Sequence, residues 1–286
     1  MPFITIITPA YNAARYITEC IESVQRQTFS DFQHLILDGL STDDTVTLVK
    51  KCQEQSDTLK LFSEKDEGIY DAMNKGINCS SGEWLYFLGA DDILYNENVL
   101  ENMAAYLRKG DAQIIYGDVF FKNYKKLYDG VFDIEKILKK NLCHQAVFYY
   151  HTVFKLNGPY NQKYRTEADY DLNLRCWLGG RVKHQYVPLI IARFAEGGLS
   201  SANRDLLFWN DFPVTAVEET LHGNWRSFTK IHWLAKVYRK IFQRFPFRYF
   251  LSMIFRSDGF YYRFPSFLWM CMTSPYYMLK SLKPEA

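Results

Sequence analysis

A short aromatic run, Trp84–Leu88, is followed by a small-residue turn and then by two adjacent carboxylates, Asp91 and Asp92. Its length and its lack of charge predict a strand that is buried on both faces of a sheet. In an open α/β sheet, ligands bind just beyond the carboxyl ends of the strands. Neighbouring carboxylates repel each other unless a cation or hydrogen-bond donors relieve them. The pair therefore indicates either a divalent-metal site or the N-terminal cap of a helix that begins near Ile93.

Strands alternate with helices along the first part of the chain. The expected strands are Phe3–Thr8, Phe32–Leu37, Leu59–Ser63, 83–88 and Ala112–Tyr116. The expected helices lie at 13–27, 45–55, near 69–76 and at 97–108. Such alternation is typical of right-handed βαβ units, so we expect an α/β fold with a mainly parallel central sheet flanked by helices.

Beyond residue 119 the alternation loosens. The expected elements there are a hairpin over Phe120–Tyr128, a short helix over Phe132–Lys140, a strand over Ala146–Tyr150, a helix over Tyr170–Leu178 and a strand-rich stretch, Val182–Phe194, broken at Pro188. We expect this region to complete the same domain.

Polar residues stand just past the ends of four successive expected strands: Asn12, Asp38, Asp66 and the pair Asp91 and Asp92. Each of them alone is as well explained as a turn or cap residue. Because parallel strands end at one edge of a sheet, the four together favour a nucleotide-sized site. The chain lacks Gly-x-Gly-x-x-Gly after the first strand and lacks Gly-Lys-Ser/Thr, which argues against dinucleotide and P-loop cradles. Phosphate charge must then be met by a metal or by side chains.

The charge is unevenly distributed. Residues 222–286 hold eleven Lys and Arg against Asp258 and Glu285, a balance of +9, which leaves −7 for residues 1–221 because the whole chain carries +2. We therefore divide the chain into a domain at 1–202 and a helical, basic, aromatic-rich extension at 203–286. Basic amphipathic helices with aromatic faces suit an anionic membrane surface, and a helical cap on the sheet is the alternative. The acidic first part argues against nucleic acid as a partner.

The six cysteines are scattered without a Cys-x-x-Cys pair, which argues against zinc and against a disulfide framework and favours a reducing compartment. The N-terminus opens directly into a strand, so we expect no signal peptide. These features predict a cytoplasmic protein.

Five motifs in order carry a resemblance to a known family. They are Thr8-Pro9-Ala10-Tyr11-Asn12, Asp38-Gly39-x-Ser41-Thr42-Asp43-x-Thr45, Asp66-x-Gly68 leading to Asn74-Lys75-Gly76, Gly89-Ala90-Asp91-Asp92, and Asp169-Tyr170-x-Leu172-x-x-Arg175. Over roughly residues 3–200 the chain resembles a family 2 glycosyltransferase with the GT-A fold. It most resembles bacterial members that assemble polysaccharides on a lipid carrier.

The resemblance implies roles for particular residues. At the nucleotide, the resemblance implies that the base is surrounded by Pro9, Ala10, Tyr11 and Asn12. It implies that Asp38 accepts a hydrogen bond from the base, which favours uracil or guanine. It also implies that Asp66 and Lys75 lie near the base, ribose or phosphates. Asp91 is implied to contact ribose or metal, and Asp92 to hold a divalent cation, Mn²⁺ or Mg²⁺, on the diphosphate.

The resemblance also implies that Asp169 is the catalytic base. Many relatives have Glu-Asp where this chain has Ala168-Asp169, so Glu167 and Asp171 remain competitors for the role. His144, Gln145 and Arg175 are candidates for contacts with the acceptor or the diphosphate. A structural role for His144 at the start of a strand is as well supported.

The resulting hypothesis is a metal-assisted, inverting glycosyltransferase that is peripheral on the inner face of the cytoplasmic membrane. It would move a sugar from a UDP- or GDP-sugar to a glycan acceptor, such as one linked to polyprenyl diphosphate. A metal would stabilise the leaving diphosphate, and a carboxylate would deprotonate the acceptor hydroxyl. The alternatives are a nucleotidyltransferase that acts on a sugar phosphate and a non-catalytic, membrane-associated nucleotide-binding domain.

Overall fold

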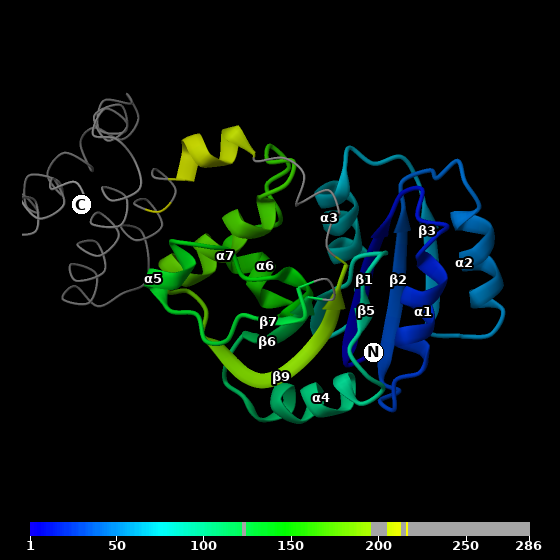
Figure 1. The fold of residues 1–286 in the computed structure, drawn as a ribbon, viewed down its shortest axis with the longest axis horizontal. Coiled ribbons are helices and arrows are strands. Elements are labelled where there is room, and N and C mark those ends of the chain that lie inside the picture. Colours follow the sequence, from blue (N-terminus) through cyan, green and yellow to red (C-terminus); the bar gives the residue numbers. More distant parts are fainter. Residues whose placement is uncertain (122–123, 196–204, 213–215, 217–286) are drawn as a thin grey trace, which may run out of the picture.

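The computed structural model describes residues 1–121, 124–195, 205–212 and 216. They form a nine-stranded sheet with helices on both faces (Figure 1). The strands are β1 (Ile4–Ala10), β2 (Phe32–Asp38), β3 (Leu59–Ser63), β4 (Trp84–Phe87), β5 (Ile93–Leu94), β6 (Ile114–Phe121), β7 (Lys126–Tyr128), β8 (Val147–Tyr150) and β9 (His184–Phe194). The helices are α1 (Ile17–Gln25), α2 (Thr45–Gln53), α3 (Ile69–Cys79), α4 (Val99–Lys109), α5 (Ile134–Ile137), the 3₁₀ turn η1 (His144–Ala146), α6 (Thr152–Asn157) and α7 (Ala168–Gly179). The expected α/β fold is confirmed.

Strand β4 lies at the centre of the sheet, between β1 and β8. Trp84 and Tyr86 pack into the core on the face covered by α1 and α4. Leu85 and Phe87 pack into the opposite core, with residues of α3 and α7. All four side chains are buried, so the prediction of a strand buried on both faces is confirmed.

The sheet is mixed. Along the order β3-β2-β1-β4 every neighbouring pair is parallel, whereas β8 is antiparallel to both β4 and β6, β7 is antiparallel to β6, and β5 is antiparallel to β9. Only β6 and β9 form a parallel pair in the second half. The expectation of a mainly parallel sheet therefore fits the βαβ half, and the expected hairpin at β6–β7 is confirmed.

Strand β9 continues through Pro188 instead of breaking there. Its register with β6 shifts between the pairs Tyr116–Tyr186 and Asp118–Ile190, which leaves extra β9 residues opposite Gly117. Such a bulge tolerates a proline, which has no N–H to donate to a neighbouring strand. The strand curves across the lower side of the molecule in Figure 1 and ends at the pocket described below.

The first described part of the predicted extension packs on the domain. In a helix over residues 206–212, Phe208 and Phe212 are almost fully buried, with ring centroids 5.1 and 5.8 Å from that of Tyr170 on α7. Residues 217–286, where the membrane-binding surface is predicted, lie outside the described residues. None of the helices in the described part combines the length and the apolar character needed to cross a bilayer.

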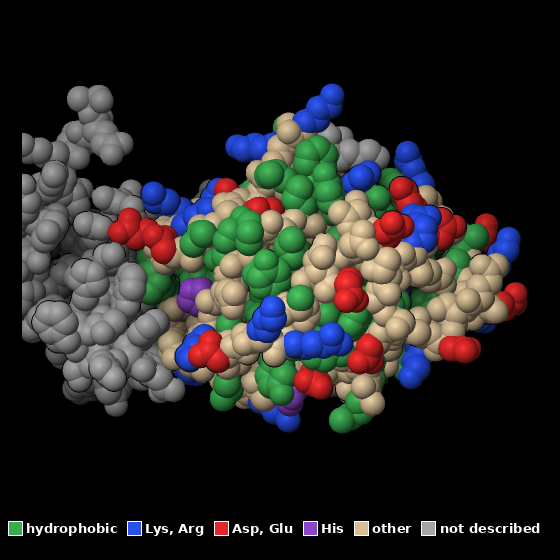
Figure 2. Space-filling view, turned by 90° about the horizontal axis from the view of Figure 1, so that it is seen from below, with side chains coloured by type: hydrophobic (Ala, Val, Ile, Leu, Met, Phe, Trp, Pro, Cys, Tyr) green, Lys and Arg blue, Asp and Glu red, His purple; other side chains and the backbone are tan. Residues whose placement is uncertain are grey.

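On the face drawn in Figure 2, acidic and basic side chains of the described residues are interspersed around a band of hydrophobic side chains. Charge alone therefore does not mark a binding surface there. The polar strand ends and the pocket beside them are the more informative feature.

Candidate active site

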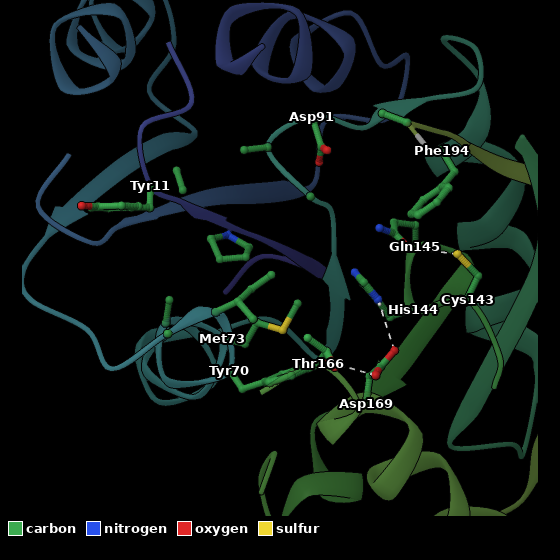
Figure 3. A pocket seen from close by; sticks show the side chains of 18 of the residues that line it. Tyr11, Tyr70, Met73, Asp91, Cys143, His144, Gln145, Thr166, Asp169 and Phe194 are labelled. Carbon is green, nitrogen blue, oxygen red and sulfur yellow. Dashed lines mark hydrogen bonds and ion pairs between the residues drawn. The ribbon is translucent and has the colours of Figure 1, made fainter. Parts of the chain in front are cut away.

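A pocket of about 600 Å³ opens at the carboxyl ends of β1 and β4 and extends to η1 and the start of α7. Figure 3 shows Tyr11 at one end and Asp169 at the other, with the carboxylate of Asp91 pointing toward the space between them. The predicted site residues that line it are Pro9, Ala10, Tyr11, Asn12, Asp66, Asp91, His144, Gln145 and Asp169. The convergence predicted for the strand ends is therefore largely present.

The loop after β1 presents Tyr11 at the rim, where it is 63% exposed. Asn12 adopts a left-handed conformation with φ of 50°, which asparagine tolerates better than most residues. Its N–H donates to Ser41 Oγ at 2.9 Å, and its Oδ1 accepts from the Thr42 N–H at 2.9 Å. The loop after β2 thus fixes the loop after β1 and leaves the ring of Tyr11 open for stacking.

Asp38 and Asp66 occupy different depths. Asp38 is buried, accepts from Ser63 Oγ at 2.6 Å and from the Ser41 N–H at 3.2 Å, and does not line the pocket. Asp66 lines the pocket, and a Cβ added at Gly39 would lie only 2.3 Å from its Oδ2. The structure therefore gives Asp38 a role in shaping the loop and gives Asp66 direct access to a ligand.

Lys75 lies outside the pocket. Its ammonium forms ion pairs with Asp71 at 3.2 Å and Glu64 at 3.4 Å, the former one turn away on the same helix. These local acids hold the side chain, so the structure does not place it on a bound nucleotide as predicted.

Arg175 is likewise outside the pocket. It pairs with Asp171 at 2.9 Å, one turn earlier on α7, and donates to the backbone carbonyl groups of Asn157 and Pro159. This pairing ties the loop before Tyr160 to α7. It also occupies Asp171, which leaves Asp169 and Glu167 as the carboxylates of this segment that line the pocket.

The two adjacent aspartates differ sharply. Asp92 is 1% exposed; its Oδ1 accepts from the Ala195 N–H at 2.8 Å and its Oδ2 accepts from Gln145 Nε2 at 2.6 Å. Burial, and next the charge of Asp91, raise the pKa of Asp92 to about 7. Asp91 instead lines the pocket. The predicted division, with Asp92 on the ion, is therefore not what the geometry offers, because both oxygens of Asp92 are held by protein donors.

Asp169 is the second residue of α7 and is 7% exposed. Its Oδ1 accepts from Tyr70 Oη and from the Tyr170 N–H, each at 2.9 Å, and its Oδ2 accepts from Asn141 Nδ2 at 2.8 Å. These three donors fix the orientation of the carboxylate at the edge of the pocket. Burial and the neighbouring Asp169 raise the pKa of Tyr70 well above its ordinary value, so its hydroxyl stays a donor.

His144 reaches the same carboxylate. Its Nδ1 lies 3.4 Å from Asp169 Oδ2, and its side chain lines the pocket (Figure 3). Gln145, next in η1, turns its amide to Asp92 and accepts from the Cys143 thiol at 2.9 Å. The 3₁₀ turn η1 thus contacts Asp169 through His144 and Asp92 through Gln145.

Tyr70 and Asn141, whose side chains donate hydrogen bonds to the carboxylate of Asp169, were not predicted from the sequence. Tyr70 occupies a position in α3 that a hydrophobic pattern explains fully. Asn141 lies 28 residues before Asp169, in a segment with no recognisable motif. No sequence motif marks either residue, because each contacts Asp169 from a position that is distant in sequence.

The side chains of the pocket are compatible with a divalent cation that is bound together with a nucleotide. Among the described residues, three or more His, Cys, Asp or Glu side chains do not gather into one metal-binding group. A cation that bridges a diphosphate needs only one or two protein carboxylates, since phosphate and water supply the other oxygens. Asp91 offers one such oxygen donor in the pocket, so the residues fit a nucleotide-bound cation.

The chain belongs to glycosyl transferase family 2, whose family model matches residues 5–164, and it is a glycosyltransferase with the GT-A fold. It is similar to the PGL/p-HBAD biosynthesis glycosyltransferase of Mycobacterium bovis, with 37% identity over 218 residues, which is 75% of this chain and 85% of that protein. The family and fold expected from the motifs are confirmed.

Solved structures agree on the fold. The structure of S. aureus TarS in complex with UDP-GlcNAc matches with a TM-score of 0.72 and 19% identity, over 91% of this chain and 77% of that chain. The mannosyltransferase PcManGT from Pyrobaculum calidifontis, in complex with GDP-Man and Mn²⁺, matches with a TM-score of 0.57 and 13% identity, over 98% and 86%.

Proposed function

We propose that the chain transfers a sugar from a nucleoside-diphosphate sugar to a hydroxyl of a saccharide acceptor, with inversion. The observation that carries this proposal is that Asp91 and Asp169 face one pocket, which Asn12 also lines and which has Tyr11 at its far end (Figure 3). The nucleotide would lie at the Tyr11 end and the diphosphate at Asp91. The similar proteins with bound UDP-GlcNAc and GDP-Man support a nucleotide-sugar donor.

The chemistry is a single displacement. The acceptor oxygen attacks the anomeric carbon while the bond from that carbon to the diphosphate oxygen breaks. The acceptor proton passes to the Asp169 carboxylate, and the nucleoside diphosphate leaves with the electron pair. Tyr70 and Asn141 orient Asp169, and His144 beside it is placed to stabilise the reacting groups. A positioned base of this kind is typically worth about 10²–10⁴-fold in rate.

Asp91 is the protein ligand that we assign to a divalent cation, in place of Asp92. A bound Mg²⁺ or Mn²⁺ would supply charge that stabilises the leaving diphosphate. Asp92 is assigned a positioning role, because its two hydrogen bonds hold the loop that carries Asp91 against η1 and the end of β9.

A thermal-shift screen tests donor binding. UDP, GDP and their sugars are added with and without Mn²⁺, and stabilisation rises with free ligand over its dissociation constant. We expect one base to stabilise the protein in a Mn²⁺-dependent way, and we expect Asp91→Asn to abolish that dependence. Asp44→Asn, at a helix start outside the pocket, is the matched control. Equal stabilisation by every nucleotide, or none by any, would contradict the proposal.

Product analysis separates the reaction classes. A glycosyltransferase releases a nucleoside diphosphate from the sugar donor, whereas a nucleotidyltransferase releases pyrophosphate from a nucleoside triphosphate. Incubation with each substrate and chromatography of the products distinguishes them. Release of pyrophosphate would refute the assignment.

We further propose that residues 222–286 hold the protein on the cytoplasmic face of an anionic membrane, beside a lipid-linked acceptor such as a polyprenyl-diphosphate saccharide. The eleven Lys and Arg of this segment and its many aromatic residues support this proposal. Flotation of the full chain with phosphatidylglycerol vesicles should succeed at low salt and fail with phosphatidylcholine. Absence of binding to either kind of vesicle would contradict it.

A further inference from the structure

We propose that the acceptor binds through a ring that packs on three aromatic side chains, Phe121, Tyr128 and Phe194, which we name the aromatic wall. All three line the pocket and are partly exposed. The inference rests on the proposed function and adds the chemical class of the acceptor: a pyranose or an aromatic ring with a hydroxyl near one edge.

The three rings form one surface on neighbouring strands. Phe121 ends β6, Tyr128 ends β7 and Phe194 ends β9. The ring of Phe121 stands edge to face against both others, with centroids 5.3 Å from Tyr128 and 5.2 Å from Phe194. Because Phe121 and Phe194 are paired in the β6–β9 ladder and Tyr128 packs across the β6–β7 hairpin, the backbone fixes their spacing.

Hydrogen bonds connect the aromatic wall to the catalytic base. Tyr128 Oη donates to the Asn141 carbonyl oxygen at 2.6 Å, and Asn141 Nδ2 donates to Asp169 Oδ2 at 2.8 Å. One residue therefore holds both the wall and the base, so a ring on the wall has a fixed relation to the carboxylate.

The other end of the wall lies beside the paired aspartates. Phe194 precedes Ala195, whose N–H donates to Asp92 Oδ1 at 2.8 Å. Figure 3 shows Phe194 on the Asp91 and Gln145 side of the pocket, away from Tyr11. Tyr11 and the Phe194 edge of the aromatic wall therefore lie on different sides of one pocket, which Asp91 and Asp169 also line.

Aromatic faces favour ligands that present C–H bonds or a π system, because the ring surface is apolar and carries negative charge on its face. A pyranose presents such C–H bonds on one face and its hydroxyls at the edge. An aromatic ring with a hydroxyl has the same arrangement. A flexible polar chain gains nothing from this wall, so the wall selects for ring-bearing acceptors.

Saturation-transfer NMR on the full chain tests the wall directly. The probes are methyl β-D-glucopyranoside and phenyl β-D-glucopyranoside, each added to protein that holds UDP or GDP and Mg²⁺. We expect saturation of pyranose C–H protons from the first probe, and the second probe shows whether the aromatic ring or the sugar takes the wall. Absence of saturation on both probes, in protein that binds nucleotide, would overturn the inference.

Paired variants assign the contact. Phe121→Leu and Phe194→Leu should each weaken probe binding about tenfold, as expected for loss of one aromatic face. Phe120→Leu is the matched control on the same strand: Phe120 packs with Tyr95, at 6.2 Å, and does not line the pocket. Equal loss in Phe120→Leu and Phe121→Leu would refute the wall.

Nucleotide binding separates this inference from the proposed function. Thermal stabilisation by UDP or GDP with Mg²⁺ should be unchanged in Phe121→Leu and Phe194→Leu. If the wild-type chain shows no such stabilisation, the proposed donor site fails. If nucleotide stabilises the protein and the wall variants bind the probes as the wild type does, the wall alone is wrong.

Discussion

The two halves of the sheet build their parts of the pocket in different ways. In the parallel half, β3-β2-β1-β4, the loops after the strands carry Tyr11, Asn12 and Asp66 within short motifs. In the other half, Asp169 takes hydrogen bonds from Tyr70 and Asn141, which lie 99 and 28 residues away in sequence. The comparison teaches that the proposed nucleotide end is assembled locally, whereas the proposed reacting end depends on the completed fold.

Asp169→Asn should impair sugar transfer without affecting nucleotide binding. We expect transfer to fall by about 10²–10⁴-fold, because the amide cannot accept the acceptor proton, while nucleotide binding stays at the wild-type level. The measurements are product formation and nucleotide-induced thermal shift on the same preparation. Glu167→Gln is the control on the neighbouring pocket carboxylate. Near-normal turnover of Asp169→Asn would remove it as the base.

Asp91→Asn and Asp92→Asn should separate cation binding from positioning. We expect Asp91→Asn to weaken Mn²⁺-dependent nucleotide binding at least about tenfold with little change in thermal stability. Asp92→Asn should instead destabilise the fold by about 1–3 kcal/mol, because its amide cannot accept from both Ala195 and Gln145. Titration calorimetry and urea unfolding report the two effects. Loss of Mn²⁺-dependent binding in Asp92→Asn, with destabilisation in Asp91→Asn, would identify Asp92 as the metal ligand.

Tyr11→Ala should weaken the nucleotide end by loss of stacking. Base stacking on an aromatic side chain is worth about 1–3 kcal/mol, so we expect KM for the donor to rise about tenfold with kcat little changed. Tyr16→Ala is the comparison variant: its ring also lines the pocket but is covered by the guanidinium of Arg15. A fall in kcat alone would place Tyr11 at the reacting end instead.

The smallest expected effect concerns one histidine in each half. Burial lowers the pKa of His34 on β2 to about 3 and that of His184 on β9 to about 4. The unfolded chain gains these protons near pH 6.5 and the folded chain does not, so the free energy of unfolding falls below pH 6.5 and continues to fall to about pH 4 for His184. Each histidine should contribute about 1 kcal/mol between pH 7 and 5.5.

Urea unfolding of His184→Phe at the two pH values tests this contribution, because phenylalanine keeps the stacking on Trp177 and removes the titration. We expect a shallower pH dependence in this variant than in the wild type. Identical pH dependence in wild type and His184→Phe would contradict the assignment.

The sequence predicted the parallel half well, because βαβ periodicity and polar strand ends are local signals. It predicted Tyr11, Asn12, Asp66 and Asp169 at one pocket, and the structure brings them together. It did not predict that Lys75 and Arg175 lie elsewhere, because their partners are acids one helical turn away that compete with any ligand.

The mixed second half was harder to predict for a physical reason. Antiparallel returns place strands beside partners that are remote in sequence, so β8 pairs with β4 and β6 without a repeating signal. The burial of Asp92 follows from the same topology. Its partners Gln145 and Ala195 lie before β8 and after β9, far from Asp92 in sequence. The sequence around the two adjacent aspartates therefore does not show which of them is buried.

The hydrogen bond from the Ala195 N–H to Asp92 has a consequence for how such an enzyme can change over evolution. It joins the strand that ends in Phe194 to the turn that carries Asp91. A backbone shift at the end of β9 that reshapes the proposed acceptor surface would also disturb the turn that carries Asp91. The proposed surface can therefore change more freely through the side chains at 121 and 194 than through insertions at residue 195.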